Sequence, residues 1–227
     1  MTVGLEKNRS TRHARALLCI AVGGALLAGC AGTGSIQGRV HVPAEPAPAT
    51  PARPSPSSGA VGASNDATEA VIMAWPEAGA PAAPLVGAGG RVRVVQAGGR
   101  FVPRVLVILP GTTVEFANRD HVYHSAFSIS PPTPFDVGKY APGQVRRMRF
   151  DQVGVLKVFC ELHPSEVIYI VVAPDRWYTR PAADGDFVLL HVPPGTYLVR
   201  AWHPALADVT ERVEVSAKHS ATINFGR

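Results

Sequence analysis

Cys160 and His163 are the residues whose types and spacing most clearly suggest metal chemistry. They stand three positions apart, in a short segment between two apolar runs at 155–159 and 167–173. A thiolate and an imidazole on a tight loop that two strands hold in place can both reach one metal ion. Two ligands do not complete such a site, so a third has to come from another part of the chain.

The segment 118–125 follows another apolar run and offers two candidates for this third ligand, His121 and His124. One thiolate and two imidazoles in a roughly trigonal set, with a weak axial ligand, form the donor set of blue-copper sites. The soft thiolate suits Cu(I) and the imidazoles suit either oxidation state, so little reorganisation would accompany electron transfer. These residues therefore predict a site for one copper ion.

The elements that would hold these residues are β-strands. From residue 91 onward polar and apolar residues alternate with a period of two, and no window has the spacing of an amphipathic helix. Only 17% of the residues are charged, and the 22 Gly and 21 Pro disfavour a helical bundle, so we expect an all-β sandwich. The predicted strands are 35–42, 69–75, 91–94, 105–109, 113–118, 145–150, 155–159, 167–173, 187–192, 196–202, 212–215 and 221–225.

The chain resembles the cupredoxin family at these residues, and more closely the bacterial methylamine-utilisation-type cupredoxin-like proteins. The matching motifs are Phe101-x-Pro103, Pro110-Gly111-Thr112, Phe116-x-Asn118-x-Asp120, His124-Ser125-x-Phe127-Ser128, Phe135-Asp136, Gly154-Val155, Cys160-x-x-His163 and Tyr169-Ile170-Val171-Val172. The resemblance implies a cupredoxin-like Greek-key β-sandwich that binds one copper ion through His124, Cys160 and His163. It favours His124 over His121 as the first ligand.

In that group a small Ig/transthyretin-like β-sandwich of the carboxypeptidase-regulatory type flanks the cupredoxin domain. The motifs similar to its closing strands are Asp184-Gly185-x-Phe187, Pro193-Pro194-Gly195-x-Tyr197 and Ala201-Trp202-His203-Pro204. The resemblance implies that residues 35–75 supply the opening strands, around a disordered Pro- and Ala-rich loop at 43–65. A linker at 76–90, the cupredoxin domain at 91–174 and the closing strands at 175–227 would follow.

Position 166 departs from the family pattern, which usually places Met three residues after the loop His. Here this residue is Glu166, and the only Met residues of the chain are Met1, Met73 and Met148. Either Glu166 supplies an axial oxygen, or it is a solvated loop residue and the copper takes a backbone carbonyl or water instead. A hard carboxylate ligand favours Cu(II), which would lower the reduction potential and change the colour of the site.

Residues 1–29 are typical of an export signal, in which a basic stretch precedes an apolar run too short to span a membrane. The run ends in Leu27-Ala28-Gly29-Cys30, which resembles the bacterial lipobox. We expect Cys30 to carry the lipid and, with residues 30–34, to form the anchored N-terminus. Removing the signal takes away four basic residues and one Glu, so the formal net charge falls from +5 to +2. Nucleic-acid binding loses its main support at this point.

The cysteine count fits the metal hypothesis. Cys19 would leave with the signal and Cys30 would carry the lipid, so Cys160 is the one free thiol expected in the mature chain. A lone thiol in an oxidising compartment needs a role, either as a buried apolar residue or as a metal ligand.

These expectations describe a monomer that is lipid-anchored on the periplasmic side of the cell envelope. Ala31 after the lipidated Cys30 favours the outer membrane where two membranes are present. The expected function is one-electron transfer with a redox partner protein, such as a c-type cytochrome or a dehydrogenase. The alternatives are a copper carrier or buffer, and a metal-free envelope interaction module. A hydrolase based on Cys160 is disfavoured because no oxyanion-hole element accompanies it.

Overall fold

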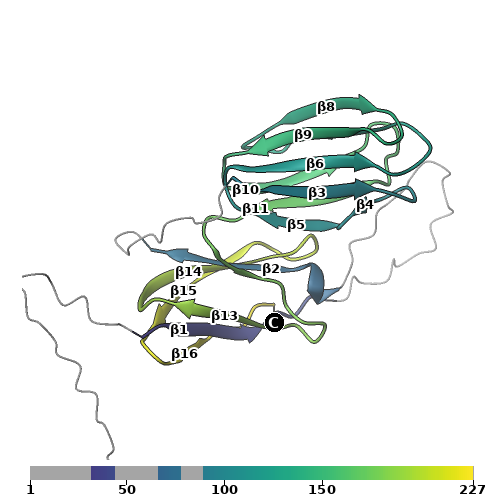
Figure 1. Ribbon diagram of the computed structural model, residues 1–227. Helices are drawn as coiled ribbons and strands as arrows, with labels where there is room; N and C mark the ends of the chain where they lie inside the picture. Colours follow the sequence, from purple (N-terminus) through teal and green to yellow (C-terminus); the bar gives the residue numbers. More distant parts are fainter. Residues whose placement is uncertain (1–31, 44–65, 78–88, 227) are drawn as a thin grey trace, which may run out of the picture. The chain divides into compact units, whose positions relative to one another are not determined.

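The computed structural model describes residues 32–43, 66–77 and 89–226, and regular structure within them is almost wholly β (Figure 1). The exception is the short 3-10 turn η1 at Ala67–Glu69, which Asp66 caps by accepting a hydrogen bond from the Thr68 backbone N–H. None of the described helical structure is long and apolar enough to cross a membrane. The all-β prediction is confirmed. The predicted signal at 1–29, Cys30 and most of the segments 43–65 and 76–90 lie outside the described residues.

The strands between residues 91 and 172 form one two-sheet sandwich. Its first sheet has the order β4-β3-β6-β9, with strands Phe101–Val102, Arg91–Gln96, Thr112–Asn118 and Val145–Phe150. Its second sheet has the order β5-β11-β10-β7-β8, with strands Val105–Ile108, Val167–Val172, Gly154–Phe159, His124–Ser128 and Phe135–Tyr140. Alternate side chains of both sheets share one apolar core, which includes Val94, Val114, Phe116, Leu156, Val158 and Ile170.

The remaining strands form a second sandwich, in which segments from both ends of the chain pair with each other. One sheet has the order β13-β1-β16, with strands Asp186–Val192, Gly34–Arg39 and Ser220–Thr222. The other has the order β12-β2-β14-β15, with strands Trp177–Thr179, Val71–Pro76, Gly195–Trp202 and Val209–Val215. Its separate core includes Ile36, Ile72, Phe187, Leu189, Tyr197 and Val199. In Figure 1 the purple β1 accordingly lies beside strands coloured for the end of the chain.

Several strands begin or end at the same end of the first sandwich. β10 runs antiparallel to both β7 and β11, and its last residue, Phe159, pairs with Val167 at the start of β11 and with Phe127 in β7. At the same end β8 finishes at Tyr140, the register partner of His124. In the facing sheet the parallel strands β3 and β6 end together, with Gln96 opposite Asn118. Residues distant in sequence can therefore meet at this end of the sandwich.

Four strands were not predicted from the sequence: β4, β7, β8 and β12. The strand β7 is buried along most of both faces, so its residues show no alternation between apolar and polar types. The strand β8 contains Asp136 and Gly138, which are poor strand formers. The consequence for the site is that His124, for which no strand was predicted, is the first residue of a strand.

Candidate metal centre

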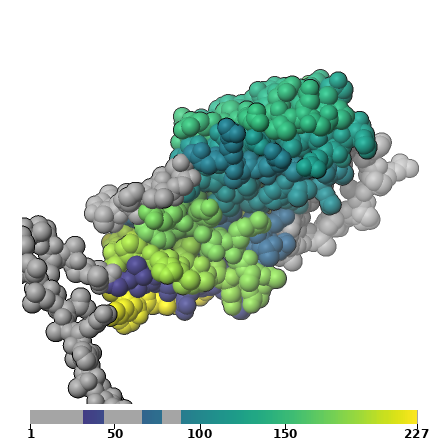
Figure 2. Space-filling model, viewed as in Figure 1, coloured from purple at the N-terminus to yellow at the C-terminus, as the bar shows by residue number. Residues whose placement is uncertain are grey.

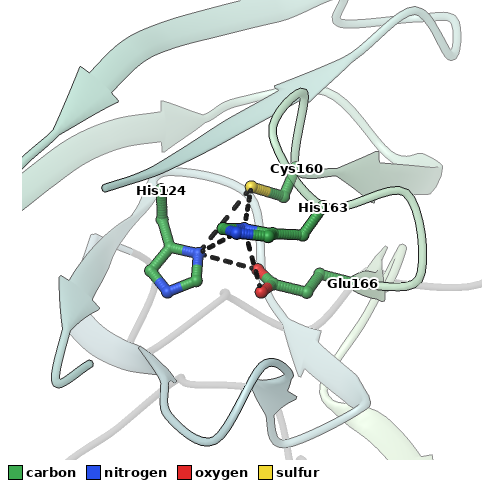
Figure 3. Close-up of side chains that lie close together, drawn as sticks. All are labelled: His124, Cys160, His163 and Glu166. Carbon is green, nitrogen blue, oxygen red and sulfur yellow. Dashed lines mark hydrogen bonds and ion pairs between the residues drawn. The ribbon is translucent and has the colours of Figure 1, made fainter. Parts of the chain in front are cut away.

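Four side chains meet at this end of the first sandwich: His124, Cys160, His163 and Glu166 (Figure 3). One candidate ligand atom from each lies within 4.8 Å of the others. His124 and Glu166 are fully buried, Cys160 is 2% exposed, and the side chain of His163 is 36% exposed. The three predicted ligands and Glu166, whose role the sequence left open, are thus brought together.

The separations between the donor atoms fit a single small metal ion. The two Nδ1 atoms of His124 and His163 are 3.1 Å apart, and the Cys160 sulfur lies 3.8 and 3.6 Å from them respectively. Glu166 brings its carboxylate to 3.0 Å from His124 Nδ1 and to 3.3 Å from His163 Nδ1. Ligands bound about 2.0–2.3 Å from one ion in a tetrahedral set lie roughly 3.3–3.8 Å from each other. The group can therefore hold one metal ion with small movements.

Local backbone bonds fix the loop that carries three of these residues. Cys160 directly follows β10, and its N–H donates to the Glu166 carbonyl at 3.2 Å. The Glu166 N–H in turn donates to the His163 carbonyl at 2.9 Å, and β11 begins at the next residue. The loop is therefore closed on itself between two paired strands, which presents the three side chains to one point.

Asp120 fixes the ring of His124. Its Oδ2 atom lies 3.0 Å from Nε2 of His124, so Nε2 carries the proton and the unprotonated Nδ1 faces the other three candidate ligand atoms. Asp120 is itself bound by the backbone N–H groups of Gly98 at 2.6 Å and Gly99 at 3.2 Å. These two hydrogen bonds hold the pKa of Asp120 below its usual value, and the bond from Gly98 has the larger effect. Both glycines have a positive φ, of 61° and 69°, which other residues adopt only at a cost.

The Cys160 sulfur accepts contacts from Ser125, the residue after His124. The Ser125 N–H lies 3.4 Å from the sulfur and the hydroxyl lies 3.8 Å from it. That hydroxyl also accepts a hydrogen bond of 2.8 Å from the N–H of Glu161. Donors directed at the sulfur stabilise its thiolate form, which is the form that binds a metal.

Glu166 is the part of the site that the sequence left open, and its side chain is fully buried rather than solvated. Gln96 at the end of β3 donates from Nε2 to Oε2 of Glu166 at 2.7 Å. The hydroxyl of Tyr140 donates to Oε1 of the same Gln96. Burial, with smaller effects of Cys160 and Glu166, raises the pKa of this Tyr140 hydroxyl, which keeps it a donor.

Other residues considered from the sequence are not members of the group. His121 is exposed, and it is not among the residues that converge. Met148 packs against the core of the first sandwich, and Met73 belongs to a different apolar cluster. Cys160 is the free cysteine of the described residues.

Sequence reasoning missed Gln96 and Tyr140. A signal for Gln96 does exist: it continues the inward-facing parity of Val92 and Val94 on β3, where a polar residue is unexpected. Tyr140 ends a strand that the sequence did not reveal, so no pattern marked its side chain as buried.

Comparisons with known proteins give structural likenesses only. No family model matches the chain, and no curated protein matches it. A copper-containing nitrite reductase (NirK) from Thermus scotoductus SA-01 is 34% identical over 36% of this chain and 22% of that chain, with a TM-score of 0.35. This chain therefore spans about a fifth of that enzyme.

Two smaller proteins are also similar. A purple cupredoxin from Nitrosopumilus maritimus is 27% identical over 36% of this chain and 98% of its own, with a TM-score of 0.33. Amicyanin from Paracoccus versutus is 20% identical over 36% of this chain and 80% of its own, with a TM-score of 0.34. Because all three TM-scores are below 0.5, the assignment of the site rests on its own geometry.

Proposed function

We propose that this protein binds one copper ion through His124, Cys160 and His163, with Glu166 as a fourth ligand, and that it carries single electrons. The observation that carries the proposal is the convergence of one thiolate and two imidazole Nδ1 atoms within 3.1–3.8 Å of each other. A soft thiolate with two imidazoles is a donor set that accommodates copper in both oxidation states. The copper ion would supply the one-electron couple.

The residues around the site support a carrier of electrons. Two of the ligands are held before any metal binds, because Asp120 fixes the ring of His124 and Gln96 fixes the carboxylate of Glu166. Three of the four candidate ligand side chains, His124, Cys160 and Glu166, are buried in the sandwich and shielded from water. In a rigid site without water, the ligand geometry changes little between the two oxidation states of the metal. This favours fast electron transfer.

The same donors argue against an enzyme. Catalytic metal sites keep an open position for water or substrate. Here Glu166 takes the fourth position with a buried carboxylate that already lies 3.0 and 3.3 Å from the two imidazoles. Nitrite reduction is an activity of the longer protein to which part of this chain is similar, and we do not extend it to this chain.

His163 is where a partner would approach. It is the one ligand with a substantially exposed side chain, and exposed apolar residues stand on the adjoining loops: Val122, Tyr123 and Leu162. Such a surface suits brief contact with a redox protein, for which a c-type cytochrome or a dehydrogenase is our proposal. The protein would act as a monomer.

The buried carboxylate has its own consequence for the redox couple. A hard oxygen donor favours Cu(II), so the reduction potential would be lower than with a thioether in the same position. The colour would also differ from that of an ordinary blue site. The same full set of four donors is the feature that favours the second candidate function, copper buffering.

The test is a copper titration of a soluble form that begins at Ala31, followed by its visible spectrum. We expect a sulfur-to-copper charge-transfer band at one copper per chain, absent in Cys160→Ser and in His124→Ala. His121→Ala is the matched control, because His121 is an exposed histidine three residues away, and it should keep the band. Tight Cu(I) binding without a reversible couple would support copper buffering instead. Binding of zinc but of neither Cu(I) nor Cu(II) would contradict both.

We also propose that the chain is exported and anchored at the periplasmic side of the envelope through a lipid on Cys30, in the outer membrane where two membranes exist. The support is the basic and apolar pattern of residues 1–29 and the Leu-Ala-Gly-Cys sequence that ends at Cys30. Metabolic labelling with a radioactive fatty acid should mark the wild type and Cys19→Ser. A labelled Cys30→Ser variant would contradict the proposal.

A further inference from the structure

The two carboxylate oxygens of Glu166 have different surroundings. Oε2 accepts the hydrogen bond from Gln96 at 2.7 Å and lies 3.0 Å from His124 Nδ1. Oε1 is also buried, lies 3.3 Å from His163 Nδ1 and has no hydrogen-bond donor. A buried carboxylate oxygen without a donor is costly unless something else satisfies it. Oε1 is thus the oxygen that a metal ion would satisfy.

The orientation of the Gln96 amide is fixed by its other neighbours. The Tyr140 hydroxyl donates to Oε1 of Gln96, which leaves the NH₂ group to face Glu166. The same Nε2 also lies 3.4 Å from the Ser125 carbonyl. A flipped amide would place its oxygen against two acceptors, the Glu166 carboxylate and the Ser125 carbonyl. Only one orientation therefore satisfies all the groups.

The chain of contacts from Tyr140 through Gln96 to Glu166 is completely buried and joins separate strands. Tyr140 ends β8, Gln96 ends β3 in the facing sheet, and Glu166 precedes β11. All three side chains have no solvent exposure. Neither Tyr140 nor Gln96 is among the residues that converge as ligands. Tyr140 and Gln96 together fix the position of the Glu166 carboxylate.

We propose that Gln96, held by Tyr140, is a positioning residue that occupies Oε2 of Glu166 and so presents only Oε1 to the metal. This inference rests on the proposed copper site. Without the hydrogen bond the carboxylate is free to rotate and to offer both oxygens or neither. Gln96 would thereby keep the site four-coordinate.

The test is a double-mutant cycle in Gln96→Met, Glu166→Gln and the double variant, all made in the complete mature chain. Met keeps the approximate length of Gln but has no amide. We expect Gln96→Met to bind copper with about 10-fold lower Cu(II) affinity, measured by competition with a chelator, and with altered Cu(II) hyperfine splitting in its EPR spectrum. In the Glu166→Gln background the same substitution should change the affinity by less than about 2-fold, because its target is gone.

Two further variants separate positioning from general stability. Tyr140→Phe removes only the hydroxyl that orients Gln96, so it should alter the EPR spectrum in the same direction but less. Ser128→Ala is the matched control, because it removes a partly buried hydrogen bond of 2.8 Å to the Lys157 carbonyl in the same sandwich. It should leave the EPR spectrum unchanged. If Gln96→Met does not fold, Tyr140→Phe carries the test alone.

The outcomes distinguish this inference from the proposed function. A wild-type protein that binds neither Cu(I) nor Cu(II) would refute the copper site itself. A wild-type band with an unchanged EPR spectrum in both Gln96→Met and Tyr140→Phe would overturn only the positioning role. Equal losses of affinity from Gln96→Met in the wild-type and Glu166→Gln backgrounds would overturn it as well, since Gln96 would then act independently of Glu166.

Discussion

The Nε2 atom of His124 lies 3.0 Å from Oδ2 of Asp120, at the edge of the ring opposite to the Nδ1 atom that faces the other three donors. This contact sets both the tautomer and the direction of the ring. It links a residue in the loop after β6 to the first residue of β7. The orientation of a buried ligand thus depends on a partly exposed carboxylate.

We expect Asp120→Asn to weaken copper binding by about 10- to 100-fold, because the amide holds the His124 N–H less strongly and also fits Gly98 and Gly99 less well. Chelator competition at neutral pH measures the change. Asp136→Asn is the control, since Asp136 makes a similar carboxylate bond of 2.8 Å to the Gly138 N–H away from the site. Equal affinities for the two variants would contradict the role of Asp120.

Ser125→Ala should lower the reduction potential of the copper. The change removes the hydroxyl at 3.8 Å from the Cys160 sulfur, so the thiolate donates more strongly and favours Cu(II). A tenfold change in the relative affinity for the two oxidation states corresponds to about 59 mV, and we expect a shift of up to this size. A redox titration followed at the charge-transfer band measures it. A higher reduction potential in Ser125→Ala than in wild type would contradict this prediction.

Glu115 should make the first sandwich sensitive to acid. Arg93 on β3 and Arg147 on β9 both bond to this carboxylate on β6, at 2.8 and 2.9 Å, and they hold its pKa below the usual value. A lowered folded-state pKa gives stability that is complete above the unfolded-state pKa, near 4.5, and is lost as the pH falls through the lower folded value. Glu115→Gln should therefore melt at a lower temperature than wild type at pH 6–7.

The difference between these two proteins should shrink as the pH falls below about 4.5, and it should vanish below the lower folded-state pKa, where wild-type Glu115 is neutral as well. Thermal unfolding followed by circular dichroism across this range measures it. A gap in Tm that stays constant down to pH 2 would show that Glu115 contributes through packing rather than through its charge.

Leu156→Ala should cost about 2–5 kcal/mol of the free energy of unfolding, because this side chain is fully buried in the core of the first sandwich. It should also alter the copper band, since Leu156 anchors β10, which ends one residue before Cys160. Leu189→Ala, in the core of the second sandwich, should cost a similar amount and leave the band unchanged. Denaturant unfolding and the visible spectrum together test the pair.

The sequence predicted the strands that have one buried face and one solvent-exposed face. The strand β9 was placed at its observed bounds because Met148 and Phe150 alternate with Arg147 and Arg149. The strand β7 was not found, because burial on both faces removes that alternation. Hence the candidate ligands Cys160 and His163 were placed correctly beside a strand, and the strand that begins at His124 was missed.

The environment of the site could be predicted less well than its ligands. Ligand types are visible in the sequence, since few residues other than Cys and His suit copper. The burial of the Glu166 side chain depends on which side chains cover the loop. These come from β3 and β8, which are distant in the sequence. Sequence alone left Glu166 between an axial ligand and a solvated residue, and burial against Gln96 excludes the second.

The four-residue turn between β3 and β4 connects two of the candidate ligands to the surface of the protein. It contains no ligand, yet Gln96 at its start supports Glu166, and Gly98 and Gly99 support His124 through Asp120. Substitutions that shift this turn would change two of the four donors together. Variation in one surface turn could therefore tune the affinity and potential of the site while every ligand stays the same.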